Sequence, residues 1–380
     1  MNILTTRISS GLVLTGFLTL AASLPSALAE PVTPASSKAL AEELGSLRNA
    51  RVAIEIADPK IKLNYFAGSM PKSDQAELAR LAPNVNIISG LSKGEALARA
   101  DEAHGIDARF ASPKFLEKAS NLRWVQVQSA GVDRYLSIDP LIKNEDLVLT
   151  NFRGIHGPAI ADHAMAMLLS LTRNLGFHAT NQEQSQWRKG RAPSNAIALQ
   201  GKTMLVVGLG GIGSEIAQRA NGFGMRVIGT RRSDSPSPEY IERVGKPQDL
   251  LTMLPEADVV ALAVPLTPET KDLLNAEAFA AMKKGSYLIN IARGKVVNTE
   301  AMLAALQSKH LAGACLDVTD PEPLPANHPL WKELNVIITP HVAGKSEVTN
   351  QRRSALTIEN LRRFGAGEPL LNVVDKKVGY

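Results

Sequence analysis

Three polar side chains in the last third of the chain have types suited to acid–base chemistry beside a bound carboxylate. Arg293, in an N-I-A-R-G run, carries a planar guanidinium fork that can hold a carboxylate and polarise an adjacent carbonyl group. His341, in a T-P-H run, titrates near neutral pH and can therefore donate or accept a proton. Glu322 lies among prolines and would orient this imidazole and favour its charged form. We expect these three side chains to form a catalytic group.

Each of these side chains follows an apolar segment that predicts a β-strand. The segments span 286–291, 313–318 and 336–339. Ligands bind at the carboxyl ends of the strands in an open parallel sheet, which favours a shared site. A structural alternative stays open for each residue: Arg293 as a salt-bridge partner, Glu322 as a turn cap and His341 as a hydrogen-bonded loop residue. No set of His, Cys and carboxylate residues has metal-site spacing, so we expect no metal.

A glycine-rich turn, G-L-G-G-I-G, directly follows the apolar segment 203–207 and opens a helical pattern. The first glycine permits the tight turn, the second lets a pyrophosphate approach the backbone, and the third lets the helix pack close to its strand. In this strand–turn–helix context the pattern predicts a dinucleotide site rather than an empty turn. The predicted contacts are Gly208, Gly210, Gly211, Ile212 and Gly213.

The next predicted strand, 226–229, ends in Thr230, Arg231 and Arg232. An NAD site usually has an acidic residue here, which accepts hydrogen bonds from the ribose 2′-hydroxyl. Two guanidinium groups would instead bind a 2′-phosphate through charge-assisted hydrogen bonds. The sequence therefore favours NADP over NAD, with two solvated surface arginines as the alternative interpretation.

Several separated motifs together resemble the D-2-hydroxyacid dehydrogenase family. They are the S-A-G-V-D run at 129–133, the stretch 154–173, the N-x-A-R-G run, the D-V-x-x-x-E-P-L-P run and the T-P-H run. Their order and spacing match the family over nearly the whole chain after the first residues. The Thr-Arg-Arg end of the second strand is similar to the NADPH-dependent glyoxylate/hydroxypyruvate reductase branch.

This resemblance implies a hydride transfer between the nicotinamide cofactor and a small 2-oxo acid, with the D-2-hydroxy acid as product. It implies that Arg293 holds the substrate carboxylate together with the N–H groups of Ala130 and Gly131, while His341 supplies the proton. Asp317 would accept a hydrogen bond from the nicotinamide carboxamide. Val264 and Pro265 are also assigned to cofactor binding.

Apolar runs alternate with helical patterns along the rest of the chain, which favours parallel sheets covered on both faces. A long helix is predicted from Pro158 to about Leu175, with Gly176 as its stop. It is apolar on nearly every side, which is typical of a helix buried between domains or subunits. A helix over about 346–364 is expected to return to the first domain. The remaining strands are predicted at 52–56, 85–88, 124–128, 147–150 and 259–264.

The expected fold class is α/β, with two Rossmann-like or flavodoxin-like domains. The dinucleotide-binding domain, 153–344, would be inserted into a discontinuous substrate domain, 30–152 and 345–380. A homodimer is expected, partly by resemblance and partly because the apolar helix over 159–175 needs a partner surface. Basic residues are scattered among acidic ones despite the net charge of +5, so a nucleic-acid partner is not expected.

The first 29 residues have the pattern of a secretory signal peptide. Arg7 precedes an apolar stretch, 11–24, and the small residues of Ala27–Ala29 fit a cleavage site. We expect a periplasmic or secreted protein, with an uncleaved membrane anchor or a cytoplasmic location as the alternative.

Other functions fit the sequence less well. A non-catalytic dinucleotide-binding sensor on the same fold would be marked by loss of Arg293, Glu322 or His341, and all three are present. Phosphoglycerate dehydrogenase shares the core, but the chain has no room for an added regulatory domain after its last helix. In formate dehydrogenase the catalytic histidine is usually paired with glutamine rather than glutamate.

Overall fold

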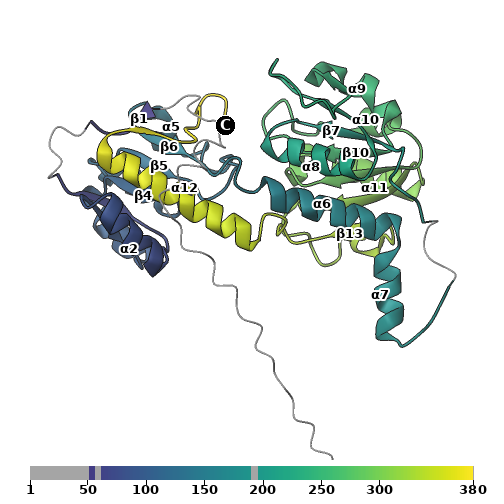
Figure 1. Cartoon of the computed structure of the whole chain (residues 1–380), viewed down its shortest axis with the longest axis horizontal. Coiled ribbons are helices and arrows are strands. Elements are labelled where there is room, and N and C mark those ends of the chain that lie inside the picture. The colour runs from purple at the N-terminus through teal and green to yellow at the C-terminus, as the bar shows by residue number, and fades with distance from the viewer. Residues whose placement is uncertain (1–50, 56–60, 190–195, 380) are drawn as a thin grey trace, which may run out of the picture. The chain divides into compact units, whose positions relative to one another are not determined.

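The computed structural model describes residues 51–55, 61–189 and 196–379. All the elements described below belong to one unit, Pro31–Tyr380 (Figure 1). The predicted signal peptide, 1–29, the start of the predicted substrate domain and the end of the predicted strand 52–56 lie outside the described residues. None of the helices among the described residues combines the length and the apolar character needed to cross a membrane.

The first part of the chain forms a five-stranded parallel sheet in the order β3-β2-β4-β5-β6. Its strands are β2 (Leu63–Phe66), β3 (Val85–Ile88), β4 (Gly105–Asp107), β5 (Trp124–Gln126) and β6 (Val148–Thr150). Between them lie α2 (Lys72–Leu81), α3 (Lys93–Ala98), η1 (Ala100–Glu102), η2 (Ala108–Phe110), α4 (Pro113–Lys118) and α5 (Asp139–Lys143). The expectation of a parallel sheet is confirmed here.

The second part forms a seven-stranded parallel sheet in the order β13-β12-β11-β10-β7-β8-β9. Its strands are β7 (Thr203–Val207), β8 (Arg226–Thr230), β9 (Arg243–Gly245), β10 (Val259–Leu262), β11 (Ser286–Asn290), β12 (Leu311–Leu316) and β13 (Val336–Ile338). The helices are α8 (Gly211–Gly222), η3 (Pro247–Asp249), α9 (Leu250–Met253), η4 (Leu254–Glu256), α10 (Ala276–Ala281), η5 (Gly294–Val296), α11 (Thr299–Gln307) and η6 (Pro329–Lys332).

The interior strand β7 is buried along its whole length because both faces of this sheet are covered. Successive side chains of a strand point to opposite faces, so Leu205 and Val207 enter one apolar core while Met204 and Val206 enter another. A strand covered on both faces is expected to be continuously apolar rather than alternating, as the T-M-L-V-V sequence is.

The prediction of one long helix from Pro158 to about Leu175 is wrong at the carboxyl end of that helix. It forms α6 (Gly157–Thr172), and a second helix, α7 (Leu175–Glu183), follows instead of a stop at Gly176. The break lies at Asn174, whose φ of 53° is left-handed. Asparagine adopts this conformation more readily than most residues, so a single residue redirects the chain without a glycine.

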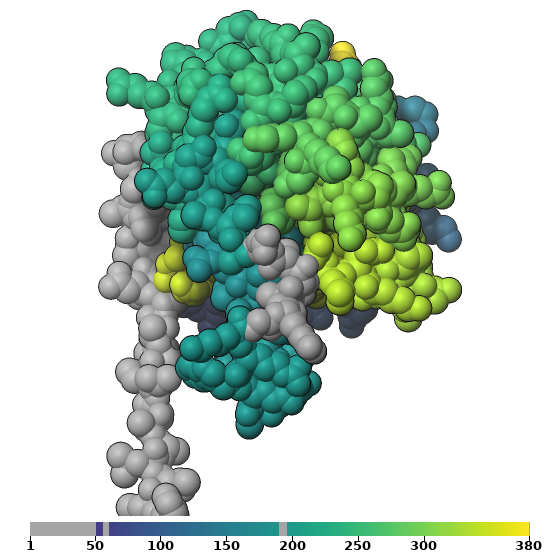
Figure 2. All heavy atoms as spheres, turned by 90° about the vertical axis from the view of Figure 1, so that its right-hand side faces the viewer, coloured from purple at the N-terminus to yellow at the C-terminus, as the bar shows by residue number. Residues whose placement is uncertain are grey.

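Helix α6 packs its Ala161, Ala164 and Leu168 into the core below the seven-stranded sheet. Much of the apolar face that the sequence analysis assigned to a domain or subunit contact is therefore covered within the chain. Helix α7 differs, because Leu175 is half exposed and Asn181 is its buried residue. Figure 2 shows this teal segment standing out from the surface beside it.

The end of the described chain packs against the five-stranded sheet. Helix α12 (Glu347–Ala366) contacts α2, and its Phe364 ring packs against Trp124 of β5 with centroids 5.2 Å apart. The short strand β14 (Pro369–Leu370) then pairs with β1 (Arg51–Val52) in an antiparallel register (Figure 1). Residues from both ends of the described chain thus support one sheet.

Candidate active site

The glycine-rich turn joins β7 to α8 and is shaped by close backbone contacts. Gly208 has a φ of 98°, a conformation that favours glycine. A Cβ atom on Gly213 would lie 2.0 Å from the carbonyl oxygen of Gly208, so a side chain there would separate the helix from its strand. A Cβ atom on Gly210 would meet nothing within 4 Å. The turn therefore leaves open space at the glycine where a pyrophosphate would approach, which fits a dinucleotide.

Two further predicted cofactor contacts border this turn. The Cγ1 atom of Val264 lies 2.8 Å from the Cβ position of Gly208, and Pro265 is exposed in the same loop after β10. Ile212, in the first turn of α8, packs partly into the core instead. The chain thus brings segments from two neighbouring strands to one edge of the sheet.

The two arginines after β8 differ in their surroundings. Arg231 turns back onto its own loop, where its guanidinium donates to the carbonyl oxygens of Ser233, Ser235 and Pro236. Arg232 is exposed. The pKa of Glu269 is lowered mainly by a hydrogen bond from Thr267, and to a smaller extent by the charge of Arg232. Thr230 is buried at the strand end. Nothing in the T-R-R-S sequence indicates that Arg231 holds the loop.

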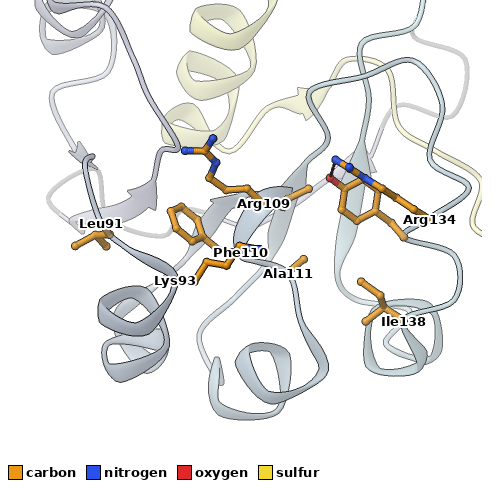
Figure 3. Close-up of a pocket in the computed structure, with 9 residues that line it drawn as sticks. Leu91, Lys93, Arg109, Phe110, Ala111, Arg134 and Ile138 are labelled. Atoms are coloured by element: carbon orange, nitrogen blue, oxygen red, sulfur yellow. Dashed lines mark hydrogen bonds between the residues drawn. The ribbon is translucent and has the colours of Figure 1, made fainter. Parts of the chain in front are cut away.

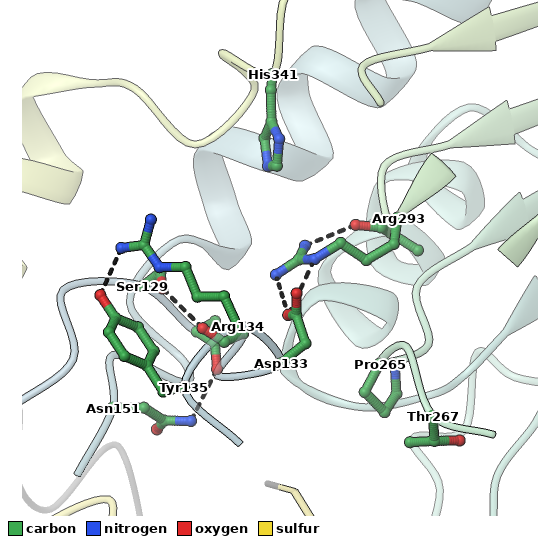
Figure 4. Close-up of polar contacts among 12 residues, drawn as sticks. Ser129, Asp133, Arg134, Tyr135, Asn151, Pro265, Thr267, Arg293 and His341 are labelled. Carbon is green, nitrogen blue, oxygen red and sulfur yellow. Dashed lines mark hydrogen bonds and ion pairs between the residues drawn. The ribbon is translucent and has the colours of Figure 1, made fainter. Parts of the chain in front are cut away.

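His341 and Glu322 form a hydrogen-bonded pair, with 2.8 Å between Nδ1 of the histidine and Oε1 of the glutamate. The two side chains are 48% and 42% exposed, so the pair is open to an entering molecule. The second ring nitrogen, Nε2, is consequently the one left to exchange a proton with a substrate. In Figure 4 the ring is directed toward the part of the site that holds Arg293.

Asp317 supports the turn that carries His341. Its buried carboxylate accepts hydrogen bonds from the Thr339 hydroxyl at 2.7 Å and from the N–H groups of Val342 and Ala343 at 2.9 and 3.0 Å. His341 itself has a left-handed φ of 54°, and its N–H donates to the carbonyl oxygen of Asp317. A non-glycine residue in this conformation persists only where the surrounding structure fixes it. Asp317 therefore has a positioning role besides the cofactor contact predicted for it.

Arg293 reaches across to the loop that follows β5. Its Nε and Nη2 atoms donate to Oδ1 of Asp133 at 3.2 Å each, and its Nη1 donates to the carbonyl oxygen of Ala292 at 2.7 Å (Figure 4). A Cβ atom on Gly131 would lie 1.8 Å from Nη2. Only glycine at position 131 lets the guanidinium lie this close to the backbone.

The loop at 129–133 presents free donors beside this guanidinium. The carbonyl oxygens of Ala130 and Gly131 are occupied by the side chains of Asn151, at 2.8 Å, and Ser129, at 2.7 Å. The N–H groups of Ala130 and Gly131 donate to no acceptor among the residues that the structure describes. Unpaired N–H groups next to a guanidinium are suited to binding a carboxylate.

Three other histidines differ in their places: His163 lies 3.7 Å from the Asp317 carboxylate, whereas His156 and His328 form no hydrogen bond or ion pair with Asp317, Arg293 or His341. His163 contacts the Thr339 hydroxyl at 2.9 Å, and Nδ1 of His328 accepts from the N–H of Leu330 at 3.3 Å. Nδ1 of His156 is buried without a hydrogen-bond partner among the described residues. Burial and the charge of Arg353 lower the pKa of His156 to about 4. No group of three or more His, Cys, Asp or Glu residues within the described ranges is arranged to hold a metal ion.

The fold is α/β, with a glycine-rich strand–turn–helix on the seven-stranded sheet and, on the five-stranded sheet, a loop whose N–H groups are unpaired among the described residues and lie beside a guanidinium. Residues 165–343 match the family of D-isomer specific 2-hydroxyacid dehydrogenases at its NAD binding domain. The chain is 36% identical to a glyoxylate reductase of Thermofilum pendens over 272 residues, which is 69% of this chain and 78% of that protein. The protein belongs to the D-2-hydroxyacid dehydrogenase family.

Solved structures agree with this assignment. A family member from Xanthobacter autotrophicus, in complex with NADPH and MES, is 29% identical, has a TM-score of 0.71 and covers 84% of this chain and 100% of its own. An NADPH-dependent glyoxylate/hydroxypyruvate reductase from Sinorhizobium meliloti, with NADP and sulfate bound, is 27% identical with a TM-score of 0.68, over 84% of this chain and 100% of its own. The chain is thus an α/β enzyme of this family, which uses a nicotinamide dinucleotide to reduce small oxo acids.

Sequence reasoning missed the main partner of one catalytic candidate. Asp133 was noticed as part of the S-A-G-V-D run but received no role, although it pairs with Arg293. Its position at the end of a motif that already supplied two substrate contacts was the available signal. Asn151 and Ser129, which fix the carbonyl groups of that loop, carried no comparable signal.

Proposed function

We propose that the protein is an NADP-preferring reductase of a small 2-oxo acid such as glyoxylate or hydroxypyruvate, with a D-2-hydroxy acid as its product. The observation that carries the proposal is the position of the Arg293 guanidinium against Gly131, beside two N–H groups with no acceptor among the described residues. A carboxylate in that place would receive hydrogen bonds from both the loop and the arginine. The relatives named as glyoxylate reductases support the same substrate class.

In this proposal the residues divide the work between binding and proton transfer. Arg293 and the N–H groups of Ala130 and Gly131 hold the substrate carboxylate and orient its carbonyl group. His341 gives a proton from Nε2 to the carbonyl oxygen, while Glu322 at 2.8 Å holds the ring and stabilises its charged form. The bound nicotinamide supplies the hydride for the carbonyl carbon.

The preference for NADP rests on the charge at the end of β8. Arg232 is exposed there and Arg231 lies beside it, while Lys246 donates to the carbonyl oxygen of Arg232 at 3.1 Å. Lys246 also pairs with Asp234, so the two arginines carry the argument for a 2′-phosphate over a free hydroxyl. The NADPH and NADP bound to the two solved relatives support this choice.

The test is oxidation of NADPH by the purified protein with glyoxylate or hydroxypyruvate as the acceptor. We expect saturable turnover with a kcat/KM that is higher for NADPH than for NADH. Saturable binding of NADPH without turnover on any small 2-oxo acid would contradict the proposal and favour a sensor. Chiral analysis of a product that has a stereocentre, such as glycerate from hydroxypyruvate, should give the D form.

We further propose a homodimer that uses α7 and the segment after it. Trp187 is 92% exposed and Leu175 is 52% exposed, so a second copy of the chain seated here would bury apolar area that the single chain leaves open. Light scattering of the purified protein should give twice the mass of the mature chain. Leu175→Asp with Trp187→Ala should shift it toward the monomer, whereas the monomer mass for the unaltered protein would exclude the dimer.

Finally, we propose export by the predicted signal peptide at residues 1–29. Cell fractionation with amino-terminal sequencing of the mature protein tests it. A first residue at Glu30 in the periplasmic or secreted fraction is expected. An intact amino terminus in the cytoplasm would contradict export.

A further inference from the structure

A cavity of about 530 Å³ lies at the carboxyl edge of the five-stranded sheet (Figure 3). Three cationic side chains line it: Lys93, Arg109 and Arg134. They come from three different segments, namely the start of α3, η2 and the loop after β5. This edge of a parallel sheet is where ligands of α/β proteins bind, and the volume is that of a small-molecule site.

The positive charge in the cavity is poorly balanced by the protein itself. No lining residue is acidic. Among acidic residues close by in the sequence, Asp133 pairs with the active-site arginine, Asp139 pairs with a lysine one turn later at 2.6 Å, and Glu95 caps its own helix. Asp107 is the one of these carboxylates that partly balances the cavity. It is buried, accepts a hydrogen bond from the backbone N–H of Arg109 at 2.9 Å, and interacts electrostatically with the Arg109 guanidinium. The single carboxylate of Asp107 balances less charge than the three cations carry, and like charges repel, so the cavity favours an external anion.

The side chains of two of these cations remain available. Neither Lys93 nor Arg109 makes a side-chain hydrogen bond or an ion pair with another residue in the described ranges. The Arg109 side chain lies over Gly68, where a Cβ atom would be 2.8 Å from its Nε. Arg134 is fixed differently: it donates to the Tyr135 hydroxyl at 2.5 Å and lies 4.7 Å from the centre of that ring. Arg134 is therefore held in place by Tyr135, and Lys93 and Arg109 are left to contact a ligand.

The remaining wall is apolar. Phe110 and Tyr135 are buried at the base of the cavity, and Leu91 and Ile138 are partly exposed at its side. We propose that this cavity binds a small molecule that carries at least two anionic oxygen groups on a compact carbon or phosphorus skeleton, such as a polycarboxylate or a phosphate compound. The cations contact its oxygens and the apolar wall contacts its body.

This site is separate from the proposed substrate site. Arg293, Gly131 and His341 do not line the cavity. The two sites are neighbours along the chain, since Arg134 directly follows the aspartate that pairs with Arg293. Because the two sites share no lining residue, binding in the cavity and turnover can be measured independently.

The experiment is calorimetric titration of the purified full chain, saturated with NADP⁺, with inorganic pyrophosphate and separately with citrate. We expect one of the two probes to bind, and the one that does identifies the source of the anionic groups. The double variant Lys93→Gln/Arg109→Gln should weaken that binding about tenfold or more, because two charge-assisted contacts are lost. Lys284→Gln/Lys332→Gln, which removes two exposed lysines elsewhere, should leave it unchanged and controls for net charge.

Arg293→Gln separates the cavity from the substrate site. Equal binding to this variant is expected, whereas loss of binding would place the anion at the active site and overturn the proposal. Binding of neither probe, or equal binding to the Lys93→Gln/Arg109→Gln variant, would also overturn it. Lys93→Gln and Arg109→Gln are also titrated singly. A thermal melt of each variant shows whether it is folded, so that misfolding of the double variant is not mistaken for loss of binding.

Discussion

Arg293 meets the carboxylate of Asp133, 160 positions away in the chain, through two nitrogen atoms at 3.2 Å each. A guanidinium group has five N–H donors. Two of them donate to Asp133 and one donates to the carbonyl oxygen of Ala292, so one N–H remains on each terminal nitrogen. Because Asp133 occupies the edge formed by Nε and Nη2, the remaining N–H groups of Nη1 and Nη2 are the ones that an incoming carboxylate would contact.

Asp133→Asn should therefore weaken substrate binding more than it slows the chemical step. The amide keeps the size of the side chain but loses the charge that orients Arg293. We expect KM for the 2-oxo acid to rise about fivefold to tenfold with a smaller change in kcat. Steady-state kinetics at saturating NADPH measures both. A lower KM would instead mean that Asp133 competes with the substrate for the arginine.

His341→Ala should depress turnover without weakening the binding of the cofactor. Removal of a general acid costs roughly a hundredfold to ten-thousandfold in kcat. Glu322→Gln should cause a smaller loss, since the amide can still hold Nδ1 but cannot stabilise the charged ring. NADPH fluorescence titration gives the affinity of each variant. If His341→Ala kept the full kcat, the proton donor would have to be another group.

Arg231 and Arg232 can be separated by single substitutions, because the structure assigns Arg231 an additional contact with its own loop. Arg232→Ser should weaken NADP binding about tenfold and leave NAD binding nearly unchanged. Arg231→Asp should weaken NADP binding further and also loosen the segment at 233–237. The ratio of kcat/KM for NADPH and NADH is the measurement. An unchanged ratio in the double variant Arg231→Asp/Arg232→Ser would remove the 2′-phosphate assignment.

His156 should make the protein less stable in mild acid. Its pKa falls to about 4 in the folded state, so between that value and about 6.5 the unfolded chain binds more protons. The free energy of unfolding should be independent of this residue above about pH 6.5 and decrease by up to about 3 kcal/mol as the pH falls to 4.

Urea denaturation at several pH values measures this effect. His156→Gln should flatten the acid limb of the curve, and His178→Gln, a change at an exposed ring of α7, should not. An acid limb that survives His156→Gln would assign the loss of stability to other groups.

The sequence predicted the long strands because their signals are local. The mostly apolar segments of β7 and β11 favour buried strands, and His341 and Glu322, which were expected to pair, lie 2.8 Å apart. Strands β2, β4 and β9 were missed. The β4 sequence G-I-D has one apolar residue, and it is a strand because Ile106 fits between Phe66 and Val125 in the core.

Contacts between segments that are distant in the sequence could not be predicted, because their signals are not local. Nothing near Asp133 indicates that an arginine will reach it from another sheet, and nothing near Arg231 shows that it will fold back onto Ser235. The left-handed Asn174 was also missed, since Gly176 offered a stronger stop signal two residues later. Such features depend on the three-dimensional positions that core packing gives to the segments.

The packing of Phe364 against Trp124, together with the pairing of β14 with β1, also has a consequence for the order in which the protein is made. A ribosome releases the strands of the five-stranded sheet first and the residues that cover it last. The seven-stranded sheet is synthesised entirely in between and can close around its own core during that time. The five-stranded sheet can therefore reach its final structure only after α12 and β14 have been synthesised.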